Sequence, residues 1–184
     1  MPLLVMIAMV AITAAMRDRE LPNALPRAAL LVFGIVYIFG CWKFAIPLRE
    51  MNRHWLMFAL IINWIGDTGA YYIGSLIGRH RMAPRISPKK SWEGAAASVV
   101  FSLAGGIAYL WYFIPTVPVP QMVTITILAN VAGQFGDLAE SAMKRGAGAK
   151  DSSQILPGHG GFLDRVDSTL FSMPVIYIWI KLAM

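Results

Sequence analysis

The sequence predicts an all-α fold, a polytopic membrane helical bundle with about six transmembrane helices, and three observations support this prediction. The 184 residues are 57% hydrophobic and only 14% charged, whereas a soluble domain carries about 25% charged residues. The mean hydropathy is +0.58. Several apolar stretches approach the roughly 20 residues that a helix needs to cross a bilayer. We therefore expect one compact membrane-embedded domain over residues 1–184.

Six apolar segments are candidates for the spanning helices. The first and the last are short. The first also has the length of a signal sequence, but it lacks a basic start and no soluble domain follows it, so a spanning helix is favoured. The segments are Met1–Met16, Ala28–Leu48, Trp55–Gly78, Ala95–Ile114, Gln121–Leu138 and Leu170–Met184.

The net charge of +6 would suggest a nucleic-acid partner in a soluble protein. In a membrane protein it indicates orientation and attraction to anionic headgroups or nucleotide phosphates, so no nucleic-acid partner is expected. The positive-inside rule predicts that the basic loops face the cytoplasm, with both termini outside. The expected location is the inner (cytoplasmic) membrane. If all six segments span, the basic loops are 17–27, 79–94 and 139–169, and the opposite loops, 49–54 and 115–120, hold only Arg49 and Arg53.

The single cysteine, Cys41, excludes an internal disulfide and a cysteine-cluster metal site. It lies in an apolar run and is interpreted as a packing residue.

Two carboxylates lie within apolar segments, where a charge is costly and usually functional. Asp67 is in the middle of Trp55–Gly78, and a structural helix–helix hydrogen bond is an open alternative for it. The small residues around it recur every four positions, which favours close helix packing rather than chemistry. Asp137 lies on a stripe that turns from apolar to charged towards the cytoplasm, which favours a functional role. On a helix this stripe comprises Asn130, Gly133, Asp137, Glu140 or Ser141, and Lys144.

The stretch 141–167 contains the residue types of a phosphate site. Lysine and arginine donors suit phosphate oxygens, and the glycine-rich turn 157–161 lets the backbone approach an anion. A helix is predicted to start just after this turn, which would add its N-terminus to phosphate binding. The cationic residues are Lys144, Arg145 and Lys150.

Carboxylates near this turn predict a magnesium site. If the following helix forms, Asp164, Asp167 and Ser168 share a face. Together with Asp137 they offer oxygen ligands, and Mg²⁺ usually takes one or two carboxylates plus substrate phosphates. The expected metal ligands are Asp137 and Asp164, with Asp167 close by. His159 is a hydrogen-bonding residue whose role is open.

This stretch resembles the signature of the CDP-diacylglycerol synthase (phosphatidate cytidylyltransferase) family. The pattern Ser-x-apolar-Lys-Arg, four residues, Lys-Asp, and later Pro-x-His-Gly-Gly-apolar-x-Asp-Arg-x-Asp covers Ser141 to Asp167. The segment 87–94, Ser-Pro-Lys-Lys-Ser-Trp-Glu-Gly, is similar to a second family segment. The resemblance extends from about Trp55 to the C-terminus, and the chain is expected to lack some N-terminal helices of the family.

The resemblance implies a transferase that joins CTP to phosphatidate, with Mg²⁺ as cofactor, membrane lipids as partners and room for a homodimer. As a hypothesis, the lipid phosphate attacks the α-phosphorus of CTP and pyrophosphate leaves. The residues expected to carry the chemistry are Asp137, Asp164, Asp167, Lys144 and Arg145. The residues expected to bind the nucleotide are Ser87, Lys89, Lys90, Lys150, Asp151, His159, Gly160 and Gly161.

Three alternatives are open at this point. A CTP-dependent polyprenol or phytol kinase would release CDP instead of pyrophosphate. A transporter would use Asp67 and Asp137 as intramembrane carboxylates, although the long charged loop does not suit that role. An inactive, partner-binding protein is the third.

Overall fold

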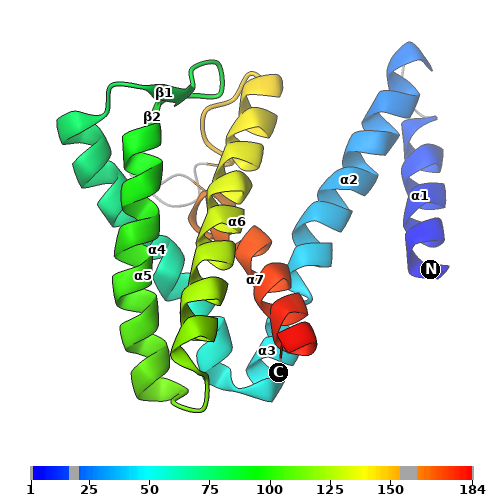
Figure 1. Cartoon of the computed structure of the whole chain (residues 1–184). Helices are drawn as coiled ribbons and strands as arrows, with labels where there is room; N and C mark the ends of the chain where they lie inside the picture. Colours follow the sequence, from blue (N-terminus) through cyan, green and yellow to red (C-terminus); the bar gives the residue numbers. More distant parts are fainter. Residues whose placement is uncertain (1, 17–20, 154–160, 184) are drawn as a thin grey trace. The chain divides into compact units, whose positions relative to one another are not determined.

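The computed structural model describes residues 2–16, 21–153 and 161–183, and it divides into two compact units, Met1–Lys43 and Phe44–Met184. The first unit contains two apolar helices joined by a short 3₁₀ turn. The second unit contains five helices and one hairpin (Figure 1). The elements are α1 (Pro2–Ala15), η1 (Leu21–Asn23), α2 (Ala24–Trp42), α3 (Ala45–Met51), α4 (Arg53–Ile77), β1 (Arg81–Ala83), β2 (Ser87–Ser91), α5 (Trp92–Phe113), α6 (Val119–Gly146) and α7 (Leu163–Ala183).

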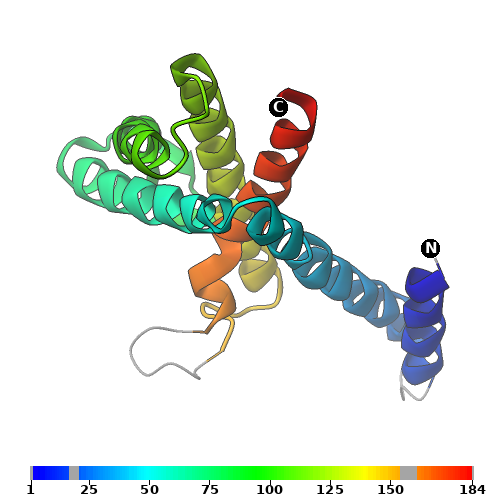
Figure 2. The ribbon, with the colours of Figure 1, turned by 90° about the horizontal axis from the view of Figure 1, so that it is seen from below.

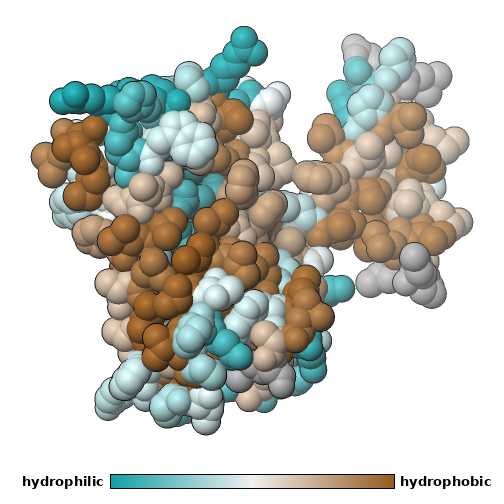
Figure 3. Space-filling model, in the orientation of Figure 1, coloured by the Kyte–Doolittle hydropathy of each residue, from teal (hydrophilic) through white to brown (hydrophobic). Residues whose placement is uncertain are grey.

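Five described segments are long and apolar enough to cross a membrane, namely Ala24–Met51 and the four helices α4, α5, α6 and α7. The predicted first span is represented by a shorter apolar helix, Leu4–Ala15. On the visible face of the second unit, apolar side chains form a belt, and hydrophilic side chains gather at the hairpin end (Figure 3). This distribution is that of an integral membrane protein, and the predicted all-α membrane bundle is confirmed.

The helices of the second unit include polar residues that adjoin the predicted apolar segments, so they extend beyond those segments. Helix α6 continues eight residues past Leu138 to Gly146, and α7 begins at Leu163 rather than at Leu170. The helix predicted after the glycine-rich turn is therefore confirmed. The loop between α6 and α7 is correspondingly shorter than the predicted loop 139–169.

Local capping interactions fix the ends of α4 and α5. The Asn52 side chain accepts a hydrogen bond from the backbone N–H of His54 at 3.0 Å, where α4 begins. The Ser91 hydroxyl accepts one from the backbone N–H of Gly94 at 3.1 Å, where α5 begins. Such caps satisfy N–H groups that the first turn of a helix leaves unpaired.

A two-stranded antiparallel hairpin connects α4 to α5, with Arg81 opposite Ser91 and Ala83 opposite Ser87. The sequence was interpreted as a loop over residues 79–94, so this hairpin was missed. Its strands have three and five residues and no alternating apolar pattern, which is the usual signal for a strand. Because the hairpin leads directly into the Ser91 cap, it fixes the position of the lysines that precede that cap.

The helices of the second unit lie side by side in the two ribbon views, with α4 packed chiefly against α5 and α6 chiefly against α7 (Figures 1 and 2). Buried amides and hydroxyls link them. The Asn130 amide donates to Ser98 at 3.0 Å and to Ser102 at 2.8 Å. The Asn63 amide donates to Ser172 at 2.8 Å. Inside a bilayer the hydrophobic effect does not drive helices together, so hydrogen bonds between such polar side chains help to hold them in contact.

Gly66 lies at a close approach of these helices, and this gives a first prediction. A Cβ atom at Gly66 would lie 2.6 Å from the Asn130 amide and from the Ser98 and Ser102 hydroxyls. Gly66→Ala is expected to lower stability by about 1–3 kcal/mol because the core cannot absorb an added methyl group without shifts. Thermal unfolding in detergent measures the loss. The matched control is Gly34→Ala, because a Cβ there meets nothing within 4 Å; equal midpoints for the two variants would contradict the prediction.

Candidate active site

A polar cavity of about 370 Å³ opens at the hairpin end of the second unit, between α4, α5, α6 and the hairpin. Its wall combines acidic and basic side chains with small residues that keep the space open. The lining residues are Asp67, Ala70, Tyr71, Met82, Lys89, Lys90, Ser91, Gly94, Ala95, Ser98, Gln134 and Asp137.

Asp137 and Lys90 form an ion pair across this cavity. The Lys90 ammonium lies 2.5 Å from Oδ2 of Asp137, and both side chains are about a quarter exposed. The Ser141 hydroxyl donates to Oδ1 of Asp137 at 3.3 Å, one helical turn along α6. The pair thus joins β2 to α6 and holds a positive charge at the cavity wall.

Three carboxylates are near enough to interact electrostatically at this point. Asp67 on α4 and Asp167 on α7 each interact with Asp137 on α6 and with one another. Asp167 is 8% exposed, and its Oδ1 accepts a hydrogen bond from the backbone N–H of Ser168 at 2.6 Å. Carboxyl groups from three helices therefore lie around the position that Lys90 reaches.

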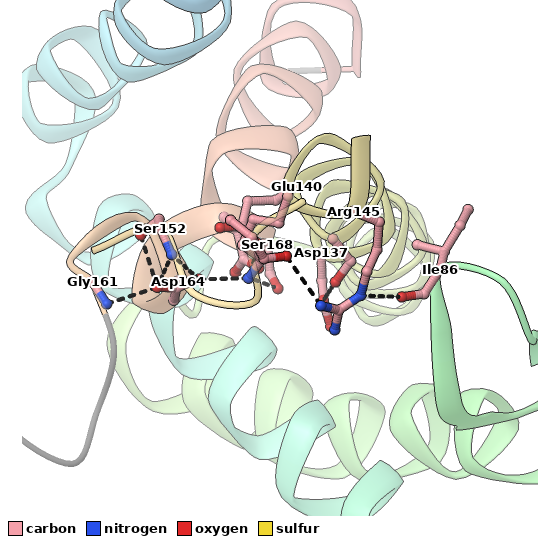
Figure 4. Close-up of polar contacts among 12 residues, drawn as sticks. Ile86, Asp137, Glu140, Arg145, Ser152, Gly161, Asp164 and Ser168 are labelled. Carbon is pink, nitrogen blue, oxygen red and sulfur yellow. Dashed lines mark hydrogen bonds and ion pairs between the residues drawn. The ribbon is translucent and has the colours of Figure 1, made fainter. Parts of the chain in front are cut away.

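A second polar cluster ties α6 to the start of α7 (Figure 4). Glu140, which is only 1% exposed, forms an ion pair with the Lys144 ammonium one turn along α6. The same ammonium lies 2.5 Å from Oδ1 of Asp164. The described contacts of the Lys144 side chain are thus with two carboxylates, those of Glu140 and Asp164.

Asp164 also connects two parts of the loop between α6 and α7, at Ser152 and Gly161. Its Oδ2 accepts hydrogen bonds from the Ser152 hydroxyl and from the backbone N–H of Gly161, each at 2.7 Å. The backbone N–H of Ser152 donates to the same oxygen at 3.0 Å. Asp164, in the first turn of α7, therefore anchors the loop to the start of that helix (Figure 4).

Arg145 braces the hairpin against the same loop. Its Nε donates to the Ile86 carbonyl at 3.4 Å, and one terminal nitrogen donates to the Ala149 carbonyl at 3.1 Å (Figure 4). The hairpin end of the segment 79–94 is thus in contact with the end of α6, at the start of the segment 141–167, and the sequence predicts both segments to lie on one side of the membrane.

The structure brings some of the predicted site residues together and separates others. Asp137, Lys89 and Lys90 line the polar cavity, with Asp167 close to Asp137. Lys144, Asp164 and Gly161 belong to the second cluster, and the described contacts of Asp137 and Asp164 lie in different networks.

The remaining predicted residues lie at the periphery or outside the described part. Ser87 pairs with Ala83 in the hairpin. Lys150 and Asp151 are exposed on the loop. His159 and Gly160 lie outside the described residues. All these assignments stay predictions.

Two functional candidates were absent from the predicted set. Asp67 lines the cavity, although the sequence alone leaves its role open; its position in a helix that enters a basic loop is the signal for a site role. Glu140 precedes Lys144 by four residues, a spacing that favours an ion pair on a helix.

Within residues 2–16, 21–153 and 161–183, no three acidic, histidine or cysteine side chains are arranged to hold a metal ion by themselves.

Comparison with known proteins gives consistent matches. A family model described as the cytidylyltransferase family matches residues 1–183. A phosphatidate cytidylyltransferase of Bacillus subtilis (strain 168) is 38% identical over 157 residues, which is 83% of this chain and 58% of that protein. Proteins of the same name from Staphylococcus haemolyticus (strain JCSC1435) and Staphylococcus aureus (strain COL) are each 38% identical over 151 residues, 82% of this chain and 58% of the relative. The chain thus spans less than two thirds of the length of these relatives.

Proposed function

Because the chain belongs to the cytidylyltransferase family, we propose that it transfers the CMP moiety of CTP to phosphatidate, giving CDP-diacylglycerol and pyrophosphate. The relatives that it matches carry the name of this activity. The observation that carries the proposal is the cavity in which Lys89 and Lys90 face the carboxylates of Asp67 and Asp137 at the polar end of apolar helices. A water-soluble nucleotide and a membrane lipid can meet at such a boundary.

The chemistry requires charge neutralisation more than a base. An oxygen of the phosphatidate phosphate attacks the α-phosphorus of CTP, and the bond from that phosphorus to the bridging oxygen of the β-phosphate breaks. The attacking group is already anionic at neutral pH, so the difficulty is to bring two anions together. Positioning and electrostatic stabilisation therefore supply most of the catalysis.

The described residues have distinct parts in this proposal. Lys90, held at 2.5 Å by Asp137, and Lys89 offer ammonium groups to phosphate oxygens. The cluster of Glu140, Lys144 and Asp164 fixes the loop between the helices, which carries Lys150 and Asp151 towards the nucleotide. Arg145 keeps the hairpin against that loop.

The donor set fits a bound Mg²⁺ at the polar cavity. Asp67, Asp137 and Asp167 are grouped closely enough to interact, and oxygen ligands from one or two carboxylates plus substrate phosphates are what Mg²⁺ usually takes. Asp137 would hold the ion, with Asp67 or Asp167 beside it. Asp164, which the sequence also predicts as a ligand, belongs to the separate cluster with Lys144, Ser152 and Gly161 rather than to this cavity, so it would hold the loop instead of the ion. When bound, the ion would neutralise charge on the CTP phosphates and on the departing pyrophosphate.

The proposed orientation places this end of the second unit in the cytoplasm, with the chain in the inner membrane. The hairpin and the adjoining loops carry the clusters of lysine and arginine that favour that side. CTP is a cytoplasmic metabolite, so the substrate and the polar cavity would meet there. A homodimer stays a prediction.

Product analysis tests the proposal directly. Purified chain is incubated with CTP, phosphatidate and Mg²⁺, with the label on the α-phosphate in one reaction and on the γ-phosphate in another. We expect the α-label in the lipid, the γ-label in pyrophosphate, and no product after chelation with EDTA. In parallel reactions with a polyprenol or phytol as the acceptor lipid, transfer of the γ-label to that lipid would support the kinase instead, and absence of labelled lipid with every acceptor would contradict both.

A further inference from the structure

The base of the hairpin lies where β2 runs directly into α5 (Figure 1). Ser91, the last residue of β2, is opposite Arg81, and α5 begins at the next residue, Trp92. The backbone N–H of Trp92 donates to the His80 carbonyl at 3.0 Å, which continues the ladder by one bond. The Trp92 carbonyl does not return that bond, because a carbonyl in the first turn of an α-helix points along the helix to the residue four positions on.

The Glu93 carboxylate takes the place of that carbonyl. The backbone N–H of His80 donates to Oε1 and Oε2 of Glu93 at 3.2 and 3.3 Å. The His80 ring donates from Nδ1 to the same Oε1 at 2.6 Å, and since a carboxylate only accepts, this ring nitrogen carries the proton. Glu93 lies in the first turn of α5, where the helix dipole favours a negative charge. One side chain therefore closes the base of the hairpin through both the backbone and the ring of His80.

The same hairpin carries Lys90 to the polar cavity, where its ammonium lies 2.5 Å from Oδ2 of Asp137. The sheet has only two strands, and a two-stranded hairpin is marginally stable by itself. Arg145 holds its far end through the Ile86 carbonyl at 3.4 Å, and Glu93 holds its base. The position of the Lys90 ammonium therefore depends on contacts at the two ends of the hairpin.

The contact between His80 and Glu93 has a local effect rather than a global one. Their side chains are 79% and 23% exposed, and exposed ion pairs add little to the free energy of unfolding. What this contact does fix is the place of a short segment beside the cavity.

We propose that Glu93 is a positioning residue for nucleotide binding. By holding His80 it keeps the hairpin on the start of α5, and it thereby keeps the Lys90 ammonium in the cavity, where the ammonium meets the phosphates of CTP. The identity of the nucleotide rests on the proposed function, whereas the clamp itself rests on the contacts between Glu93 and His80. Glu93 acts through the hairpin and does not touch the nucleotide.

Glu93→Ala is expected to raise KM for CTP about tenfold while kcat stays within about twofold, because the loss of a hydrogen bond to a charged group corresponds to about this factor. Glu93→Gln keeps an acceptor for the backbone N–H of His80 and is expected to raise KM only about threefold. The thermal midpoints of both variants should stay near that of the unmodified chain. Glu50→Ala, at an exposed position on α3, is the control and should change neither KM nor the midpoint. An unchanged KM for Glu93→Ala would overturn the proposal.

A double-mutant cycle decides whether Glu93 acts through Lys90. Lys90→Met removes the ammonium that the clamp is proposed to place. In this background Glu93→Ala is expected to raise KM by less than about twofold more, because residues that act through one group are not additive. A second full tenfold rise would show that the two residues act independently and would overturn the proposal.

Hydrogen exchange tests the clamp without turnover. In detergent, the backbone amides of residues 80–91 are expected to exchange about tenfold faster in Glu93→Ala than in the unmodified chain, because local contacts set local opening. Glu50→Ala should leave their exchange unchanged. Equal exchange in Glu93→Ala and the unmodified chain would overturn the inference.

Binding of labelled CTP in the absence of phosphatidate separates this inference from the proposed function. If the unmodified chain binds CTP about tenfold more tightly than Glu93→Ala but forms no CDP-lipid, the proposed function fails and the positioning role stands. Formation of CDP-lipid with equal CTP affinity in both chains would contradict the positioning role alone. Absence of CTP binding by the unmodified chain would contradict both.

Discussion

Asp137→Asn is expected to reduce formation of CDP-diacylglycerol by about 10³-fold, which is the effect of removing one preorganised electrostatic group from an active site. The substitution keeps the shape of the side chain but removes its charge. Lys90 then loses the carboxylate at 2.5 Å that fixes its position, and the proposed metal site loses its central ligand. The rate of α-label transfer from CTP to lipid measures the effect at saturating substrates.

A surface carboxylate provides the control for this variant. Glu50→Gln makes the same chemical change on α3, at an exposed position, and is expected to keep the unmodified rate. Thermal midpoints of both variants in detergent should stay near that of the unmodified chain. Activity of Asp137→Asn within tenfold of the unmodified chain, with an unchanged midpoint, would remove Asp137 from the site.

Lys144→Met is expected to destabilise the protein by about 3–5 kcal/mol, because removal of one member of a buried ion pair leaves an uncompensated charge. Glu140 is almost fully buried and would lose its ion-pair partner. Asp164 would lose the ammonium at 2.5 Å while still holding the loop. The thermal midpoint in detergent is the measurement.

Two further variants decide what Lys144 does. Glu140→Gln combined with Lys144→Met should recover part of the stability, because the buried charge is gone as well. Lys181→Met, at the exposed end of α7, should change stability by less than about 1 kcal/mol. If Lys144→Met instead keeps the normal midpoint and raises KM for CTP, Lys144 binds phosphate, as the sequence suggests.

The spanning helices could be predicted because the bilayer imposes a length and a composition that are visible in the sequence. Their ends could not be predicted, because α6 and α7 continue through charged residues that hydropathy excludes. Glu140 and Lys144 illustrate this, since both lie beyond the predicted segment yet remain in α6. The hairpin was missed because residues such as Pro88, Lys89 and Lys90 are poor strand formers, and tertiary contacts stabilise it instead.

The residues of the site were easier to predict than their partners. The sequence identifies acidic and basic side chains in the right segments, but it cannot tell which carboxylate meets which ammonium. Asp164 illustrates the difficulty: it lies three positions before Asp167 on the same helix, yet the two have different partners, Asp167 near Asp137 and Asp164 with Lys144. These pairings depend on how far each helix is rotated, which three-dimensional packing decides.

The hydrogen bond between Asn63 and Ser172 has a consequence for biosynthesis. Its two residues are 109 positions apart, so a ribosome has made two more apolar helices, α5 and α6, and the first half of α7 before the hydroxyl that completes the pair emerges. In the interval the amide of Asn63 has the Ala59 carbonyl of its own helix, at 2.7 Å, as a partner. Helix α4 can therefore enter the bilayer early with its amide partly satisfied, and the arrival of the last helix completes the bond.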